Sequence, residues 1–165
     1  NKGWTIAKYL LSHERTGIAG VGFSMQALEE VKAIAATIKR GAKRLIDEPL
    51  FAARLARVEI DLEAMKITNL RMLFRAQEQG APGPETSILK IKGSVINQEL
   101  QDLARRALGP LAAPFPGYVS EGNLLFGPPD TAFNASRYFN NRKTSIFGGS
   151  NEIQRNILTK TMLEL

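Results

Sequence analysis

The spacing of the apolar residues constrains the fold of this chain more than any other feature. Between Trp4 and Arg40, apolar residues recur three, four or seven positions apart, with one doubled step across position 14. This is the period of an α-helix that buries one face. No useful length of chain alternates apolar with polar residues, and no internal repeat is present. The sequence therefore predicts an all-α fold. The stripe of the first helix consists of Ala7, Leu10, Ile18, Val21, Met25, Leu28, Ala35 and Ile38.

Glycine, proline and capping residues set the expected helix limits. Gly41 is a stop signal for the first helix. Three other glycines interrupt the interior of this helix, and each lowers its stability by about 1 kcal/mol. A second helix is expected from Asp47-Glu48-Pro49, with Asp47 as the N-cap and Pro49 in the first turn, to about Gly80. The interrupting glycines are Gly17, Gly20 and Gly22, and the second apolar stripe consists of Leu55, Val58, Leu62, Met65, Met72 and Leu73.

The remaining elements follow from the same signals. A turn over 80–84 precedes a third helix from Glu85 to about Gly109, and the proline- and glycine-rich stretch 109–130 is expected to be an excursion. A fourth helix is expected from about Asp130, and a last one after Ser150. The picture is an up-and-down helical bundle, antiparallel over its first three helices. The third apolar stripe consists of Ile88, Ile91, Val95, Leu100 and Leu103.

Composition excludes several classes of protein. The chain has 165 residues, 44% hydrophobic and 23% charged, which is typical of one globular domain. It has no cysteine, and its one histidine, His13, cannot build a multi-histidine metal site. No apolar stretch approaches the roughly 20 residues of a membrane span. We therefore expect a cytoplasmic protein without a bound metal and without membrane insertion.

The net charge of +6 raises the question of nucleic-acid binding. The cations are spread from Lys2 to Lys160 and interleaved with acids, whereas a nucleic-acid interface gathers them on one face. The densest basic run, Lys39-Arg40 with Lys43-Arg44, lies beside a glycine and suits the end of a helix. No nucleic-acid partner is predicted, and the excess charge suggests an acidic partner region outside this chain.

Two local features could carry chemistry. Glu14 lies between Leu10 and Ile18, where the apolar stripe of the first helix should continue. It is either a salt-bridged structural residue or a base whose pKa burial raises. The second feature is a double glycine before Ser150, which opens the last helix. Free backbone N–H groups at such a helix start can bind phosphate or carbonyl oxygens, although the same residues also make an ordinary helix cap.

Taken together, these features resemble the C-terminal domain of the acyl-CoA dehydrogenases. The resemblance covers essentially the whole chain. Its opening segments are most similar to the large subunits of pimeloyl-CoA dehydrogenase and related bacterial enzymes. The N-terminal helical and middle β domains of that family are absent from this chain. The matching segments are Gly3-Trp4, Leu11-Ser-His-Glu-Arg-Thr16 and Phe147-Gly-Gly-Ser-Asn-Glu-Ile-Gln-Arg155.

The resemblance implies FAD-dependent α,β-dehydrogenation of an acyl-CoA thioester. Many members have their catalytic base, a glutamate, in the final loop, where this chain has Gly148. Other members take the base from the first helix of this domain, immediately before an arginine, and Glu14-Arg15 matches that arrangement. The resemblance thus assigns Glu14 as the base and Arg15 to the substrate side.

The final loop supplies the other site residues that the resemblance implies. Phe147 matches the aromatic residue beside the thioester, and Gly148 keeps a backbone N–H for the thioester carbonyl. Gly149, Ser150 and Glu152 match positions that line the FAD, Ser150 replacing a commoner threonine and Glu152 a commoner glutamine.

Two family segments that bind FAD across a subunit interface are altered. Where the family has an Arg-x-x-Phe-Gly segment, this chain has Lys39 to Asp47. In the second segment, which is Arg106 to Ala112 here, only a Leu-Gly pair matches the family. Either basic residues such as Lys43 or Arg44 substitute for these altered segments in FAD binding, or a different subunit completes the FAD site. The expected partners are an acyl-CoA, an electron-acceptor protein and a homo- or hetero-oligomer. The alternative function is a non-catalytic assembly subunit, which would have no reason to keep a carboxylate on an apolar stripe.

Overall fold

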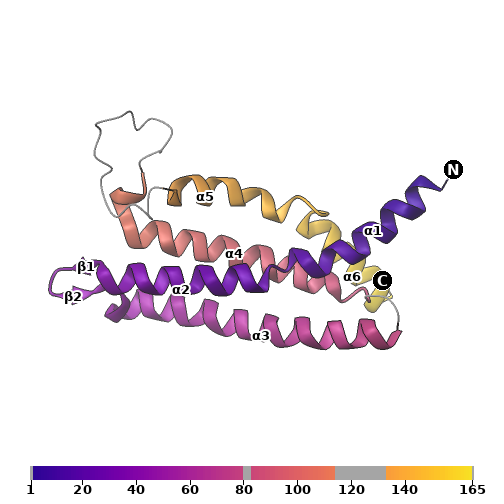
Figure 1. Ribbon diagram of the computed structural model, residues 1–165, viewed down its shortest axis with the longest axis horizontal. Coiled ribbons are helices and arrows are strands. Elements are labelled where there is room, and N and C mark those ends of the chain that lie inside the picture. The colour runs from indigo at the N-terminus through magenta and orange to yellow at the C-terminus, as the bar shows by residue number, and fades with distance from the viewer. Residues whose placement is uncertain (1, 80–82, 114–132, 165) are drawn as a thin grey trace.

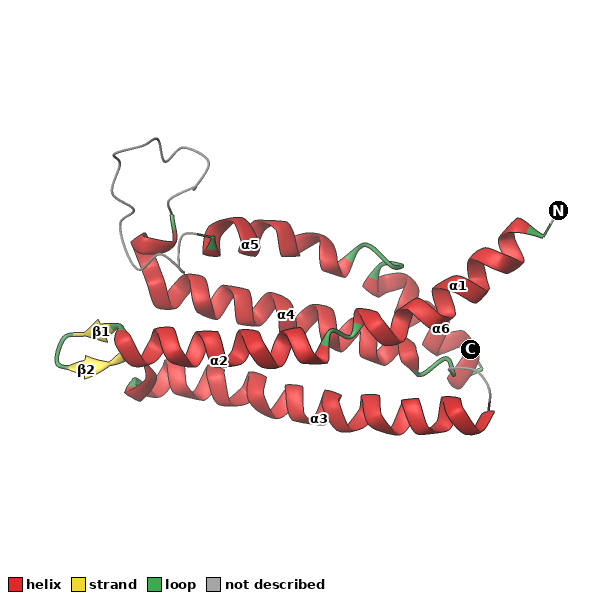
Figure 2. Ribbon diagram, in the orientation of Figure 1, coloured by secondary structure: helices red, strands yellow, loops and turns green. Residues whose placement is uncertain are grey.

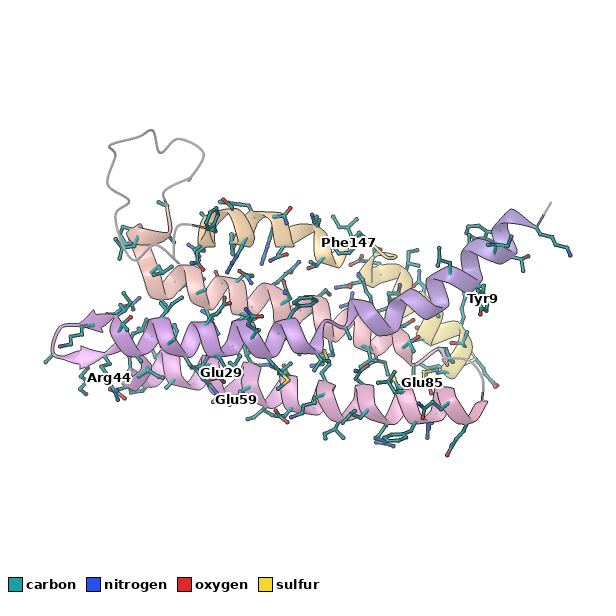
Figure 3. The ribbon with its side chains drawn as sticks, in the orientation of Figure 1. Tyr9, Glu29, Arg44, Glu59, Glu85 and Phe147 are labelled. Carbon is teal, nitrogen blue, oxygen red and sulfur yellow. The ribbon has the colours of Figure 1, made fainter. Side chains whose placement is uncertain are left out.

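Three long helices lie lengthwise against one another. The computed structural model describes residues 2–79, 83–113 and 133–164. Helices α2 (Val21–Thr37), α3 (Pro49–Gln79) and α4 (Thr86–Leu108) run up, down and up as neighbours (Figure 1). Lys32 of α2 contacts Glu59 of α3 at 2.6 Å, and Figure 3 shows Glu29 and Glu59 along this seam. The predicted helical bundle is confirmed for this part of the chain.

The first expected helix is in fact two helices. Helix α1 (Gly3–Ile18) ends before Gly20, whose φ of 57° is left-handed, and α2 begins at Val21. Because a continuous α-helix has no left-handed residue, α1 departs from the axis of α2 and projects beyond the bundle (Figure 1). Leu10 (63% exposed) and Met25 (40% exposed) do not face the core, so the single stripe from Trp4 to Arg40 is wrong.

The expected stop at Gly41 is instead the turn of a small β-hairpin. Helix α2 ends at Thr37, and strands β1 (Lys39–Arg40) and β2 (Lys43–Arg44) pair antiparallel at one end of the bundle (Figure 2). Gly41 has a φ of 63°, as a tight turn requires. Apolar–polar alternation could not reveal these strands, because each has two residues and both are exposed and basic.

Glu48, rather than Asp47, caps the second long helix. After the 3₁₀ turn η1 (Leu45–Asp47), the Glu48 carboxylate accepts hydrogen bonds from the backbone N–H groups of Leu50 (3.3 Å) and Phe51 (2.8 Å). Asp47 pairs with Arg44 at 2.7 Å and is therefore unavailable as the predicted cap. Helix α3 begins at Pro49, as expected, because proline lacks only an N–H that the first turn leaves unpaired.

The C-terminal third of the chain packs on α4. Helix α4 ends at Leu108, with Gly109 (φ 55°) after it as predicted, and continues into the 3₁₀ turn η2 (Gly109–Ala112). Helix α5 (Asn134–Asn140), the 3₁₀ turn η5 (Asn141–Ser145) and helix α6 (Asn151–Met162) follow, and each contacts α4. Most of the expected excursion over 109–130 and the expected helix start at Asp130 lie outside the described residues.

The core forms between α2, α3 and α4. The predicted stripe of α3 is confirmed from Leu55 to Met65, whereas Leu73 is exposed. On α4, Ile88 and Val95 face solvent, and their neighbours Leu89 and Ile96 are buried in their place. In the part of the chain that the structure describes, no helix is long and apolar enough to cross a membrane. The core residues of these three helices are Leu28, Val31, Ala35, Phe51, Leu55, Val58, Leu62, Met65, Leu89, Ile96, Leu100, Leu103, Ala104 and Ala107.

A charged cluster ties α3 to the C-terminal half of α4. Asp102 accepts hydrogen bonds from Arg106 (2.5 Å), Arg105 (2.9 Å) and Arg54 of α3 (3.2 Å), and Arg54 also bonds Glu99. Burial by itself would raise the pKa of Asp102, but the three arginine bonds outweigh it and hold the pKa below its ordinary value.

We expect the Asp102→Asn variant to lose about 1–3 kcal/mol of stability at pH 7, because it weakens several charge-assisted hydrogen bonds. A lowered carboxyl pKa stabilises the fold above the unfolded-state pKa, and this contribution disappears as the pH falls through the folded-state pKa. The difference from wild type should therefore shrink below about pH 4. Urea unfolding from pH 3 to 8 measures it. Asp61→Asn, which breaks the exposed pair with Lys92, should cost less than about 1 kcal/mol.

We expect Gly93→Ala to destabilise the chain by about 1–3 kcal/mol, although alanine favours helix. A Cβ at position 93 would lie 2.6 Å from the carbonyl oxygen of Ala19 and 2.9 Å from its Cα, which are backbone atoms at the α1–α2 junction. The control is Gly22→Ala, since a Cβ there meets nothing within 4 Å and should stabilise α2 by about 0.5–1 kcal/mol. Thermal unfolding compares the two, and equal effects would contradict the close approach.

Candidate active site

The predicted loop before the last helix is present and has an unusual backbone. Gly148 (φ 69°) and Gly149 (φ 88°) both adopt left-handed conformations, which residues with a side chain rarely occupy. Ser150 is the N-cap of α6, and its hydroxyl accepts a hydrogen bond from the N–H of Ile153 at 3.4 Å. The expected helix start and its cap are confirmed. The loop lies at the N-terminal end of α6, which is the positive end of the helix dipole.

Gln154 holds this loop from the first turns of α6. Its Nε2 donates to the carbonyl oxygens of Gly148 (3.0 Å) and Gly149 (3.5 Å), and its side chain is buried. A Cβ on Gly149 would lie 2.6 Å from this Nε2 atom. Both carbonyls therefore point toward Gln154. Gln154 belongs to the matching motif, but the sequence did not predict a role for its side chain.

A second clamp joins the start of α6 to α4. Lys90 of α4 is fully buried (0% exposed), and its ammonium donates to Oδ1 of Asn151 at 2.9 Å. Ser94, one turn further along α4, accepts from Nδ2 of Asn151 (3.0 Å). Its hydroxyl has two acceptors within reach, the Ile91 carbonyl oxygen (2.8 Å) and the same Oδ1 (3.2 Å). Burial lowers the pKa of Lys90, and the charge of Glu152 opposes this shift. Sequence analysis missed this clamp; the only signal was a lysine one position after the buried Leu89.

Glu152 turns away from the core. Its side chain is 76% exposed and forms a 3.6 Å pair with Arg155. Its pKa is lowered, most strongly by a hydrogen bond from its own backbone N–H and then by one from the Ser150 hydroxyl. The carboxylate thus occupies the start of α6, where a helix favours negative charge.

Phe147, which precedes the loop, and the α1–α2 junction line one cleft of about 210 Å³. Phe147, on the segment between η5 and α6 (Figure 3), lies in its wall with Gly17 and Gly20. Asn97 of α4 also lines the cleft, and its buried side-chain carbonyl oxygen has no hydrogen-bond partner in the structure. The remaining lining residues are Ala19, Phe23, Ser24, Gly93, Ser94 and Thr144.

The structure places the predicted base only at the level of the backbone. Glu14 and Arg15 lie in α1, one turn before Gly17 of the cleft wall. The side chains of residues 11–16 lie outside what the structure describes, so the roles of Glu14 and Arg15 stay predictions. Among the described residues, no cluster of three or more His, Cys, Asp or Glu side chains could hold a metal ion.

These features define a helical domain in which a glycine loop opens the last helix and the residue before that loop, Phe147, lines a cleft. Residues 1–163 match the family profile of the C-terminal domain of acyl-CoA dehydrogenases. The chain therefore belongs to the acyl-CoA dehydrogenase family and corresponds to that domain.

The curated relatives are longer than this chain. It is 31% identical over 166 residues to the acyl-CoA dehydrogenase IpdE1 of Mycobacterium tuberculosis, covering 99% of the chain but 38% of the relative. It is 28% identical to the protein of that name from Mycolicibacterium smegmatis, of which it covers 37%. The chain thus spans less than two fifths of the length of these relatives.

Solved structures share the fold. A chain of the ChsE4–ChsE5 complex of Mycobacterium tuberculosis superposes with a TM-score of 0.74 at 29% identity, over 99% of this chain and 41% of that one. Butyryl-CoA dehydrogenase of Megasphaera elsdenii superposes with a TM-score of 0.74 at 22% identity, over 98% of this chain and 39% of its own. The latter similarity concerns the fold alone.

We expect Gly149→Ala to loosen the loop, because alanine is strained at a φ of 88° and its Cβ would displace Gln154. Hydrogen exchange at the first-turn amides of α6 should accelerate at least tenfold, which corresponds to about 1.4 kcal/mol. Gly109→Ala is the control, since it has a similar strain (φ 55°) but no atom within 4 Å of the added Cβ. Exchange in α6 that rises equally in both variants would contradict the role of Gln154.

Proposed function

We propose that this chain is the C-terminal domain of an FAD-dependent acyl-CoA dehydrogenase that oxidises an acyl-CoA thioester to the trans-2-enoyl-CoA. The observation that carries the proposal is the cleft, in which the last turn of α1 and Phe147 of the final loop are neighbours. These are the two segments that the reaction requires together. We infer that the N-terminal helical and middle β domains belong to the rest of the protein.

Each candidate residue has a defined task in this reaction. The Glu14 carboxylate accepts the α-proton, and the electron pair of the broken C–H bond moves toward the thioester carbonyl. The N–H of Gly148 donates to that oxygen as its negative charge grows, while Arg15 and Phe147 position the thioester. When bound, FAD would supply the acceptor for the β-hydrogen and its electron pair, and the acyl group would thus lose one proton and one hydride and gain a C=C bond.

The residues of the loop fit a flavin placed against the start of α6. Gly148 and Gly149 leave the loop backbone free of side chains, and the helix start favours electron-rich oxygens. We infer that Gly149, Ser150 and Glu152 line the FAD. The Ser150 hydroxyl is already bonded within the helix start, so its contribution to FAD would be made in addition to capping.

The exposed β-hairpin supports a cofactor or partner contact at the far end of the bundle. Lys39, Arg40 and Lys43 have exposed side chains, whereas Arg44 is paired with Asp47. Lys43 is therefore the better of the two predicted substitutes for the missing arginine. One similar solved chain comes from a complex of two named components, ChsE4 and ChsE5, which supports a hetero-oligomer. We infer that a different subunit completes the FAD site and that a separate protein accepts the electrons.

We expect full-length wild type, purified with any subunit encoded beside it, to bind FAD and to bleach anaerobically on mixing with its acyl-CoA. Glu14→Gln should reduce the bleaching rate by about 10²–10⁴-fold, which is the contribution of a general base. Stopped-flow absorbance of the flavin measures this rate over a panel of acyl-CoAs. Glu63→Gln, an exposed change of the same kind on α3, should leave the rate unchanged.

Equal bleaching rates in wild type and Glu14→Gln would exclude Glu14 as the base. A full-length protein that binds no FAD with its neighbouring subunit present would instead favour the alternative, a non-catalytic assembly subunit. The isolated domain is expected to show no turnover in either case, because the middle domain completes the active site.

A further inference from the structure

Lys90 is a charged residue in a place where charge is costly. It has no exposed surface, and its described hydrogen-bond partner is the neutral side-chain amide of Asn151. An ammonium taken out of water without a bonded counter-ion costs several kcal/mol. Among the residues whose side chains the structure describes, the carboxylate whose charge offsets this burial is that of Glu152, which is exposed and forms no salt bridge with Lys90.

We propose that Lys90 is a positioning residue whose buried positive charge stabilises the enolate oxygen that forms beside the Gly148–Ser150 loop. This inference rests on the proposed function. Lys90 does not touch the substrate; it acts through Asn151 and through the field that its charge adds at the start of α6.

The contacts connect Lys90 to the loop in two short steps. Lys90 holds Asn151, the first residue of α6, and Gln154 of the same helix holds the carbonyl oxygens of Gly148 and Gly149. With these carbonyls turned toward Gln154, the loop keeps its N–H groups for a ligand. The dipole of α6 and the ammonium both place positive potential at this point, so an anion there completes the charge balance.

Lys90 is dispensable for hydrogen bonding within the clamp. If its ammonium were removed, Nδ2 of Asn151 would still donate to Ser94. The single Ser94 hydroxyl proton can be donated either to the Ile91 carbonyl oxygen, 2.8 Å from Oγ, or to Oδ1 of Asn151, 3.2 Å from Oγ. Oδ1 therefore keeps a partner when the Ser94 hydroxyl turns from Ile91 toward it. Replacing a buried charge by an apolar side chain of similar length is often neutral or stabilising. The buried charge of Lys90 thus costs folding free energy, and another side chain could fill its place in the packing. We therefore assign the charge a role toward a ligand.

The test uses the full-length flavoprotein with any partner subunit, in two measurements. The first is the thermal unfolding midpoint of the flavin-free protein. The second is the pH at which bound acetoacetyl-CoA ionises to its enolate, followed by the enolate's ultraviolet absorbance. Acetoacetyl-CoA is the probe because it forms the same oxygen anion without turnover.

We expect Lys90→Met to keep or raise the unfolding midpoint and to raise the ionisation pH by about one unit. One charge acting over roughly 10 Å at an effective dielectric of about 20 changes an equilibrium by about ten- to twentyfold. The bleaching rate should fall by a similar factor. Lys92→Met is the matched control, because it removes the same charge from the same helix at an exposed position and should move neither measurement.

Variants of Asn151 separate the charge from the tether. Asn151→Asp keeps an acceptor for Lys90 but neutralises its charge, so it should raise the ionisation pH as Lys90→Met does. Asn151→Ala removes the tether and keeps the charge, so it should shift the ionisation pH less. If only Lys90→Met and Asn151→Ala shifted it, the tether would explain the effect and the charge proposal would be wrong.

Two outcomes overturn the proposal while leaving the dehydrogenase function intact. One is an unchanged ionisation pH in Lys90→Met within a wild-type background that bleaches with acyl-CoA. The other is an unfolding midpoint that falls by several degrees without a change in ionisation, which would make Lys90 a structural residue. A wild type that holds neither FAD nor acetoacetyl-CoA would instead overturn the proposed function itself, and this proposal with it.

Discussion

The packing of α4 is the constraint on which the rest of this structure depends. Helix α4 contacts α1, α2, α3, α5 and α6, and it is buried on more than one side. Its small residues decide how close the other elements come: Gly93 lies against the backbone of Ala19, and Ser94 lies within hydrogen-bond distance of Asn151. The α1–α2 junction and the segment that leads into α6 are thereby both held against α4, and Phe147 of that segment lines the cleft with Gly17 and Gly20.

The two halves of α4 differ in how their charged side chains are paired. Near its C-terminal end, the partly buried Asp102 accepts from three arginines, which balance its charge and stabilise the bundle. Near its N-terminal end, Lys90 is buried beside the Asn151 amide, and no described carboxylate pairs with it. Charge pairing stabilises the fold at the first site, whereas the Lys90 ammonium bonds the first residue of the helix that follows the loop, which the proposed function places against the reacting thioester.

Elements set by local signals could be predicted, and those set by distant contacts could not. The limits of α3, α4 and α6 followed from Pro49, Gly109 and Ser150, because capping and proline geometry act within one helical turn. The face of α4 was misjudged in its N-terminal half, where Leu89 and Ile96 are buried instead of Ile88 and Val95. In its C-terminal half, Leu100 and Leu103 are buried as expected. A helix with several buried sides offers no single stripe, and the choice between neighbouring faces depends on which helices pack there.

The amino-acid sequence by itself determined the helical class, the family and the glycine loop before the last helix, because these depend on short-range periodicity and on a contiguous motif. Tertiary structure alone decided the break at Gly20, the hairpin at Gly41 and the burial of Lys90. Each of these depends on atoms distant in sequence: the approach of Ala19 to Gly93, the bond of the Leu45 N–H to the Ile38 carbonyl at the base of the hairpin, and the clamp between Lys90 and Asn151. A linear pattern records the period of a helix but not the neighbour that each of its faces meets.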